Sequence, residues 1–266
     1  KPHHAIVNDS VEASKKLKKE KLVNGVLRNI IKGKSEIKYG KHIYPGFKKI
    51  LDKIFSSKSI SNYIYETLFV KPKNYQISLS DKNNALYGKR VYNLEKRIFK
   101  ECFVQDIGNF EIIKSVHKFF IDKNIIDVCA APGGKSILLS SLGFNVFAID
   151  KSQRQIDKLK ENLKRLNISL NIKKIDFLIH KFTKKYNSIL LDAPCSALGT
   201  FRRNPDVTVK IDRSIIKKHQ KTQLKMLEKS IELLNKQGFL AYVVCSFHPF
   251  ETIDVIDKVI QKHKNI

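Results

Sequence analysis

Three side chains in the second half of the chain have the types and spacing that covalent catalysis requires. Cys195 lies three residues after Asp192, and Cys245 follows the apolar stretch 238–244. A cysteine thiolate can attack an electrophilic carbon, so both cysteines are candidate nucleophiles. The ordinary alternative for an unpaired cysteine is a small apolar side chain in the core. The residues alone leave both possibilities open for each cysteine.

A loop of small residues earlier in the chain is a candidate cofactor site. Residues 127–136, DVCAAPGGKS, join an apolar run to a segment with helical character. Small side chains let a backbone approach a ligand closely, and glycines permit a tight turn. The pattern is neither the G-x-x-x-x-G-K-[ST] phosphate loop nor the G-x-G-x-x-G dinucleotide loop. The candidate ligand-lining residues are Cys129, Ala130, Ala131, Pro132, Gly133, Gly134 and Lys135.

Two more acids follow apolar runs and extend this candidate site. Asp150 ends the run 145–149, where a carboxylate can accept hydrogen bonds from a ribose diol. Asp176 ends the run 170–175, where it can accept from an adenine amino group or from the residues around it. A local alternative for Asp150 is the start of a helix, because Ser152, a good N-cap residue, follows it.

The elements that must hold these residues alternate along the chain. Strands are predicted at residues 125–129, 145–149, 170–175, 188–191 and 238–244. Helices are predicted at 136–142, 153–166 and 220–234, the second with apolar residues at helical spacing. This alternation predicts an α/β fold with a doubly wound, mostly parallel sheet. Ligands of such sheets bind outside the carboxyl ends of the strands, where the three acids and Cys245 fall.

The charge of the chain favours a polyanionic partner. The formal net charge is +26 and the isoelectric point is about 9.8. Basic proteins bind nucleic acids because neutralising phosphates releases condensed counterions. Arg202 and Arg203 are candidates to contact RNA phosphates, with an ordinary solvated surface as the alternative. Abundant Lys and absent Trp also fit an AT-rich genome, which would raise the charge whatever the partner.

The four cysteines and the hydropathy pattern limit the protein's class and location. No two cysteines form a C-x-x-C pair, so no metal site is expected. No apolar run reaches the roughly 18 residues of a membrane helix, and no signal peptide is evident. We therefore expect a cytoplasmic protein, a monomer, with reduced thiols. Cys129 is expected to pack in the cofactor loop, and Cys102 in the core.

The first 120 residues carry weaker signals. Residues 9–19 and 22–31 are predicted to form short helices, 32–44 a basic linker, 47–55 another helix and 69–79 an extended segment. The predicted organisation is a helical remnant at 1–33, a linking and RNA-contacting subdomain at 34–105, and a catalytic domain at 106–266.

The motifs together resemble one enzyme family. The matching segments are DVCAAPGGKS at 127–136, ILLDAPCS at 189–196 with Gly199, RRNPD at 202–206 and VCS at 244–246. In combination they resemble the RsmB-type (Fmu/Sun) RNA 5-methylcytosine methyltransferases, over roughly residues 103–257. Residues 4–8 and 22–28 are similar to the last helices of the NusB-like RNA-binding domain of that family, so the N-terminus resembles a truncated form of that domain.

The resemblance implies a fold, a cofactor and a role for each site residue. It implies a Rossmann-like class I fold that binds S-adenosylmethionine at the 129–135 loop, with Asp150, Asp176 and Asp192 completing that site. Cys245 matches the nucleophile that adds to cytosine C6, and Cys195 matches the cysteine that assists release of the methylated product. Asp192 matches the acid that contacts the base.

The chain departs from the family pattern near the nucleophile. Val244 stands where the family usually has Thr. Residues 248–252, His-Pro-Phe-Glu-Thr, replace a usual Pro-Glu-Glu-Asn run and keep Pro249 and Glu251. These changes bear on efficiency more than on enzyme class.

Three functions remain as hypotheses. The leading one is an RNA cytosine-C5 methyltransferase, with 16S ribosomal RNA as the expected target and transfer RNA as the second. A non-catalytic RNA-binding or ribosome-assembly factor on the same fold is the alternative from another class. A DNA cytosine methyltransferase would instead use Cys195, in its Pro-Cys motif, as the nucleophile.

Overall fold

The computed structural model describes residues 21, 45–70, 72–79, 91–93 and 102–263. The chain divides into two compact units, Lys1–Pro45 and Gly46–Ile266. The helices predicted at 9–19 and 22–31 and the linker predicted at 32–44 lie outside the described residues, apart from residue 21. The domain limits inferred from the sequence stay predictions.

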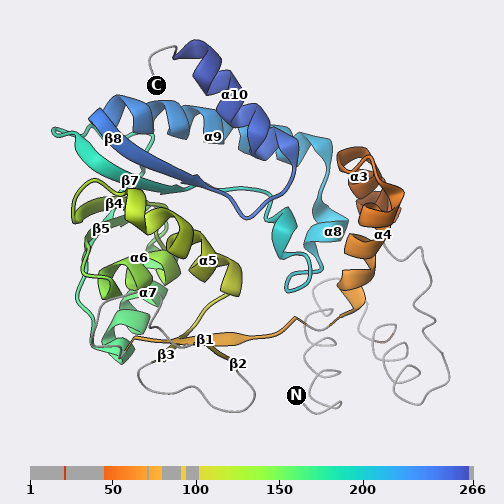
Figure 1. Cartoon of the computed structure of the whole chain (residues 1–266), viewed down its shortest axis with the longest axis horizontal. Helices are drawn as coiled ribbons and strands as arrows, with labels where there is room; N and C mark the ends of the chain where they lie inside the picture. Colours follow the sequence, from red (N-terminus) through yellow and green to blue (C-terminus); the bar gives the residue numbers. More distant parts are fainter. Residues whose placement is uncertain (1–20, 22–44, 71, 80–90, 94–101, 264–266) are drawn as a thin grey trace. The chain divides into compact units, whose positions relative to one another are not determined.

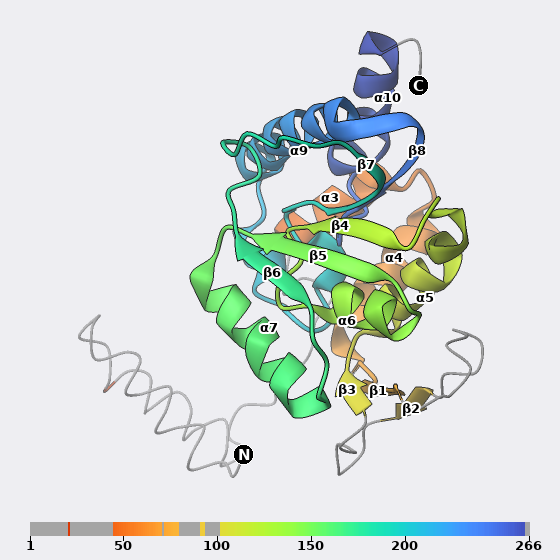
Figure 2. The ribbon, with the colours of Figure 1, turned by 90° about the vertical axis from the view of Figure 1, so that its left-hand side faces the viewer.

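A five-stranded parallel sheet forms the centre of the second unit (Figure 2). Its order is β6-β5-β4-β7-β8, so the chain starts in the middle strand, moves to one edge and then returns to build the other. The strands are β4 (Asn124–Val128), β5 (Asn145–Asp150), β6 (Asn171–Lys174), β7 (Tyr186–Asp192) and β8 (Leu234–Val243). Every neighbouring pair in this sheet is parallel, which confirms the predicted doubly wound α/β fold.

The central strand is apolar because both of its faces are covered. Ile125, Ile126 and Val128 of β4 are at most 1% exposed. Parallel strands in α/β proteins are buried on both sides and therefore have near-continuous apolar runs. This explains why alternation of apolar and polar residues was absent from the sequence at β4.

Helices cover the two faces separately. Side chains of α5 (Ile107–Val116), α6 (Gly134–Ser141) and α7 (Gln153–Leu166) pack with Ile125 and Val146 in one core cluster. Side chains of α9 (Arg213–Leu233) and α10 (Ile253–Lys262) pack with Ile126 and Val128 in the other. Figure 1 shows α9 and α10 on one side of the sheet and α5–α7 on the other.

Smaller elements precede the five-stranded sheet. Helices α3 (Pro45–Ile54) and α4 (Lys58–Glu66) lead into a short antiparallel sheet of β1 (Tyr75–Ser78), β2 (Val91–Asn93) and β3 (Cys102–Val104). Most of the helix predicted at 47–55 is present, although it starts two residues earlier. The segment predicted to be extended at 69–79 contains a strand only at its end.

Several predicted boundaries were wrong for local reasons. Helix α9 begins at Arg213 instead of 220, because the Asp212 carboxylate accepts hydrogen bonds from the Ser214 and Ile215 amides and caps the helix there. Strand β8 begins at Leu234 instead of 238, directly after α9. Helices α5 and α10 were not predicted, although Asp106 caps α5 through the Gly108 amide in the same manner.

Candidate active site

Six of the ten predicted cofactor residues line one cavity at the carboxyl edge of the sheet, whereas Cys129, Gly133, Asp150 and Asp176 are not part of its wall. The cavity has a volume of about 220 Å³. Its wall includes most of the loop between β4 and α6, together with Asp192 at the end of β7. The predicted residues that line it are Ala130, Ala131, Pro132, Gly134, Lys135 and Asp192.

The loop has a backbone that only small residues allow. Gly133 has φ +102°, in the left-handed region, and a Cβ there would lie 2.1 Å from Leu159 Cδ1 of α7. Cys129 also has a positive φ, of 63°. Burial raises the pKa of the Cys129 thiol to about 12, which keeps it protonated and unreactive. Cys129 therefore packs beneath the loop, as expected, and Cys102 is fully buried in the core.

Asp150 connects the cofactor loop to the start of α7. Its Oδ2 accepts a hydrogen bond from the Ala131 amide at 3.3 Å, and its Oδ1 accepts one from the Ser152 amide at 2.8 Å. Ser152 itself caps α7. The local role that the sequence left open is thus present, and the carboxylate also reaches the loop. A site role for Asp150 is compatible with both contacts.

Asp176 lies apart from the cavity wall. It follows β6 by two residues, and its Oδ1 accepts a hydrogen bond from the Leu178 amide at 3.0 Å. Its part in adenine binding stays a prediction.

A partly buried ion pair joins the loop to the end of β7. Lys135 Nζ lies 2.6 Å from Asp192 Oδ2, and only 10% of the lysine side chain is exposed. This contact favours electrostatic support of the site as the role of Lys135, because its charge compensates the Asp192 carboxylate.

The two candidate nucleophiles are in contact. The sulfur atoms of Cys195 and Cys245 are 3.1 Å apart, although 50 residues separate them. The hydrogen bond from Cys195 lowers the pKa of Cys245, whereas the same contact, followed by burial, raises the pKa of Cys195. Cys245 is exposed and Cys195 is half-buried. Cys245 is therefore the more accessible thiol of the pair and the one with the lower pKa.

Cys245 opens into a second, larger cavity of about 770 Å³. Arg202 and Arg203 line the same cavity, as does Asp106. The Arg203 guanidinium already has three protein acceptors, Asp106 at 2.7 Å, Asn74 at 2.6 Å and the Lys73 carbonyl at 2.7 Å. Arg202 donates one hydrogen bond, to the Val70 carbonyl at 3.2 Å. Their contact with RNA stays a prediction.

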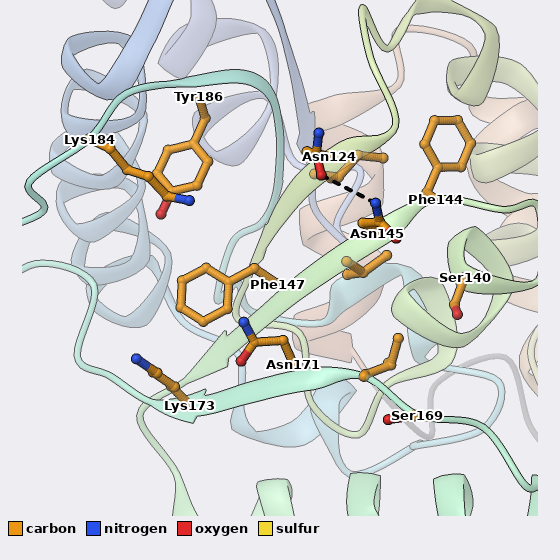
Figure 3. A pocket seen from close by; sticks show the side chains of 13 residues that line it. Asn124, Ser140, Phe144, Asn145, Phe147, Ser169, Asn171, Lys173, Lys184 and Tyr186 are labelled. Atoms are coloured by element: carbon orange, nitrogen blue, oxygen red, sulfur yellow. Dashed lines mark hydrogen bonds between the residues drawn. The ribbon is translucent and has the colours of Figure 1, made fainter.

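A third cavity contains none of the predicted site residues. It measures about 490 Å³ and lies at the opposite edge of the sheet, where β4, β5 and β6 begin at Asn124, Asn145 and Asn171 (Figure 3). Ligands of open parallel sheets bind at the carboxyl edge, so the two cavities there are the candidate active site.

Sequence reasoning missed Gln105. This side chain lines the smaller cavity and is 6% exposed, and within the described part of the chain neither of its amide atoms has a hydrogen-bond partner. A buried amide without partners inside a cavity is expected to bind a polar ligand group. Its only sequence signal was its position just before the α5 cap residue, Asp106.

Comparisons with known proteins agree with this geometry. The family model described as 16S rRNA methyltransferase RsmB/F matches residues 119–266. The ribosomal RNA small subunit methyltransferase B of Photorhabdus laumondii is 34% identical over 167 residues, which are 61% of this chain and 39% of that protein. The chain therefore spans less than half the length of this relative.

Solved structures give the same fold. A methyltransferase homologue from Pyrococcus horikoshii superposes with a TM-score of 0.61 at 21% identity, covering 82% of each chain. NSun6 from the same organism, solved with SFG, has a TM-score of 0.56 and 28% identity over 61% of this chain and 43% of its own. Because the family model covers more than half of the sequence, this chain belongs to the S-adenosylmethionine-dependent 16S rRNA methyltransferase RsmB/F family.

Proposed function

We propose that the protein transfers a methyl group from S-adenosylmethionine to C5 of a cytosine in 16S ribosomal RNA, through a covalent adduct with Cys245. The observation that carries this proposal is the contact of two thiols beside a carboxylate and a cofactor loop. Cys195 and Cys245 are 3.1 Å apart, and Asp192 lies three residues from Cys195.

The cofactor fits the smaller cavity by the chemistry of its wall. The unpartnered Gln105 amide offers both a donor and an acceptor to the amino-acid end of the cofactor. Gly134 lines the same cavity, and a Cβ there would lie 2.7 Å from Gln105 Nε2, so the glycine leaves that amide accessible to a ligand. Asp150 is not part of this wall, but its carboxylate accepts from the Ala131 amide of the wall at 3.3 Å, and we assign it as the acceptor for the ribose hydroxyls. When bound, S-adenosylmethionine supplies an electrophilic methyl group on its sulfonium.

The chain's own residues account for the remaining steps. Carbon C5 of cytosine is too weak a nucleophile to take a methyl group unaided. The Cys245 thiolate adds to C6, which makes the ring an enamine whose C5 can attack the methyl carbon. A base then removes the C5 proton, the C5–C6 double bond re-forms, and the Cys245 thiolate leaves. Asp192 holds the N3 and amino edge of the base, and Cys195 assists the elimination.

The pKa shifts of the two cysteines support Cys245 as the nucleophile and Cys195 as the residue that assists elimination. A nucleophile needs a thiolate near neutral pH, and the pKa of Cys245 is the one that its partner's hydrogen bond lowers. A DNA-type mechanism would require the thiolate at Cys195, whose pKa is raised. The same pair of thiols argues for catalysis over a purely RNA-binding function, since binding alone needs neither.

The experiment compares Cys245→Ala and Cys195→Ala on unmodified cytosine RNA. Cys245→Ala is expected to abolish methyl transfer and covalent capture, because no other group can saturate C6. Cys195→Ala is expected to accumulate a covalent protein–RNA band on a denaturing gel, and only with S-adenosylmethionine present. The double variant should show no band.

Cys102→Ala is the control, because it removes a buried thiol that lines neither cavity. An adduct formed by Cys245→Ala and not by Cys195→Ala would exchange the two roles. If the wild-type protein bound RNA without methylating it, the alternative of a non-catalytic RNA-binding factor would replace this one. Bisulfite sequencing of RNA from a deletion strain would distinguish ribosomal from transfer RNA targets.

A further inference from the structure

Glu251 is a buried carboxylate beside the cysteine pair. It ends the short helix Pro249–Glu251, and its side chain is 0% exposed. No salt bridge in the described part of the chain involves it. Burying a charge without an opposite charge costs free energy unless hydrogen bonds satisfy it. The hydrogen bonds to Glu251 must therefore compensate for its burial.

Hydrogen bonds to Glu251 come from both cysteine-bearing segments. Its Oε1 accepts from the Ser196 amide at 2.7 Å and from Gln223 Nε2 of α9 at 3.3 Å. Its Oε2 accepts from the Ser196 hydroxyl and from the Ser246 hydroxyl, the latter at 2.7 Å. An ionised carboxylate accepts at about four positions, and these four donors fill them.

The two serines are the immediate neighbours of the two thiols. Ser196 follows Cys195, and Ser246 follows Cys245. One carboxylate thus ties together two loops that are 50 residues apart in sequence, while Gln223 anchors it to α9. A separate hydrogen bond, from the Gly199 amide to the Cys245 carbonyl at 3.0 Å, also holds the two loops together.

We propose that Glu251 is a positioning residue that keeps the thiols of Cys195 and Cys245 in contact, acting through Ser196 and Ser246. This inference rests on the proposed cysteine chemistry, in which one thiol attacks and the other assists elimination. Glu251 touches neither RNA nor cofactor in this role. It sets the separation and orientation of the two groups that do.

The first test measures the thiols without RNA. Cys245 is alkylated with iodoacetamide across a pH series, and the pH at half-maximal rate is compared among variants. Cys195→Ala marks the profile of a Cys245 that has lost its hydrogen-bond donor. Glu251→Ala is expected to shift the midpoint upward toward that of Cys195→Ala, because the separated thiols no longer share a proton.

The second test measures catalysis. Glu251→Ala is expected to slow covalent capture of 5-azacytidine RNA by about 100-fold, the loss typical of a reacting group displaced by about 1 Å. Glu251→Gln should fall between Glu251→Ala and the wild type. Its oxygen can still accept from the Ser196 amide, and its nitrogen can donate to the serine hydroxyls, which rotate to accept.

Ser230→Ala is the matched control. Ser230 is equally buried on α9, and among the described residues its hydroxyl bonds only the Met226 carbonyl of its own helix, at 2.8 Å. It should leave both the alkylation profile and the capture rate unchanged. If Glu251→Ala does not fold, Glu251→Gln and Ser196→Ala replace it in both tests. Thermal unfolding checks that each of these variants is folded.

The outcomes separate this inference from the proposed function. Folded Glu251 variants with the wild-type alkylation midpoint would overturn the positioning role, as would an equal shift in Ser230→Ala. A shifted midpoint in a protein that methylates no RNA would keep the positioning role and reject the proposed reaction.

Discussion

Asp150 contacts the protein backbone and is also proposed to bind the cofactor, and substitution of this residue tests the second role. Its carboxylate holds the Ala131 and Ser152 amides, and in the proposed complex it also accepts from the ribose hydroxyls. Asp150→Ala is expected to weaken S-adenosylmethionine binding, since each charge-assisted hydrogen bond contributes roughly 1.5–3 kcal/mol. Calorimetric titration measures the change.

Asp157→Ala is the control for this prediction. It removes the same charge from α7, where the Asp157 side chain has one hydrogen-bond partner within the described part of the chain, Gln153 of the same helix at 2.9 Å. Unchanged cofactor affinity in Asp150→Ala, or an equal loss in Asp157→Ala, would reject the ribose assignment.

Asp127 is expected to make the stability of the protein depend on pH. It lies fully buried beneath the cofactor loop, where burial raises its pKa from 3.8 to about 7, against the lowering effect of a hydrogen bond from Ser136. The folded protein therefore holds a proton at Asp127 up to about pH 7, while the unfolded chain loses it near pH 4. Between these values the folded state binds more protons, so this group's contribution to stability falls as pH rises.

The variant Asp127→Asn is expected to remove this dependence. The free energy of unfolding of the wild type should decline relative to that of the variant between pH 4 and 7, by at most about 4 kcal/mol, and the difference should be constant above pH 8. Urea unfolding of both proteins at several pH values, without cofactor, measures it. Parallel curves across pH 4–7 would show that Asp127 titrates normally.

At the scale of elements, we expect the β4–α6 connection to determine whether the cofactor can approach. Gly133 lies in the left-handed region against α7, and a Cβ there would overlap Leu159. Gly133→Ala is expected to destabilise the protein by about 1–3 kcal/mol through overpacking and to weaken cofactor binding, because the loop must move away from α7. Thermal unfolding and calorimetric titration measure the two effects.

A second glycine supplies the comparison. Gly46 in α3 has no atom within 4 Å of where a Cβ would lie. Gly46→Ala should therefore leave cofactor binding unchanged and should not destabilise the fold. If Gly133→Ala matched Gly46→Ala in both measurements, close backbone approach would not be what this loop requires.

At the scale of the whole molecule, the charge of +26 predicts the salt dependence of RNA binding. The logarithm of the binding constant should fall with the logarithm of salt concentration, with a slope of about −0.7 for each single-stranded phosphate contacted. Arg202→Ala should make the slope less steep by about 0.7, the amount expected for one lost phosphate contact. Fluorescence anisotropy at several salt concentrations provides the measurement.

Two results would contradict this prediction in different ways. A slope near zero in the wild type would mean that the charge reflects composition and not a polyanion-binding surface. A wild-type slope retained in Arg202→Ala would mean that Arg202 has a structural role through its bond to the Val70 carbonyl and contacts no phosphate.

The sequence by itself determined the sheet, the cofactor loop and the acids at its rim. Those features have local signals: apolar runs for buried strands, small residues for a close turn, and Asp150 and Asp192 directly at strand ends. In a parallel sheet all carboxyl ends meet at one edge, so local patterns were enough to predict that these residues lie at the same edge of the sheet. The α9 start and α5 were missed because their signals are single capping residues, Asp212 and Asp106, which also occur in turns.

Only the tertiary structure decided which side chains touch. The thiol contact joins residues 50 apart, the Arg203–Asp106 pair joins residues 97 apart, and Glu251 reaches Ser196 across 55 residues. None of these pairs has a local pattern, because the distance between two side chains on different loops depends on how the intervening helices pack. Packing also buries Gln105 and Glu251, and burial is what turns an ordinary polar residue into one that must find a partner.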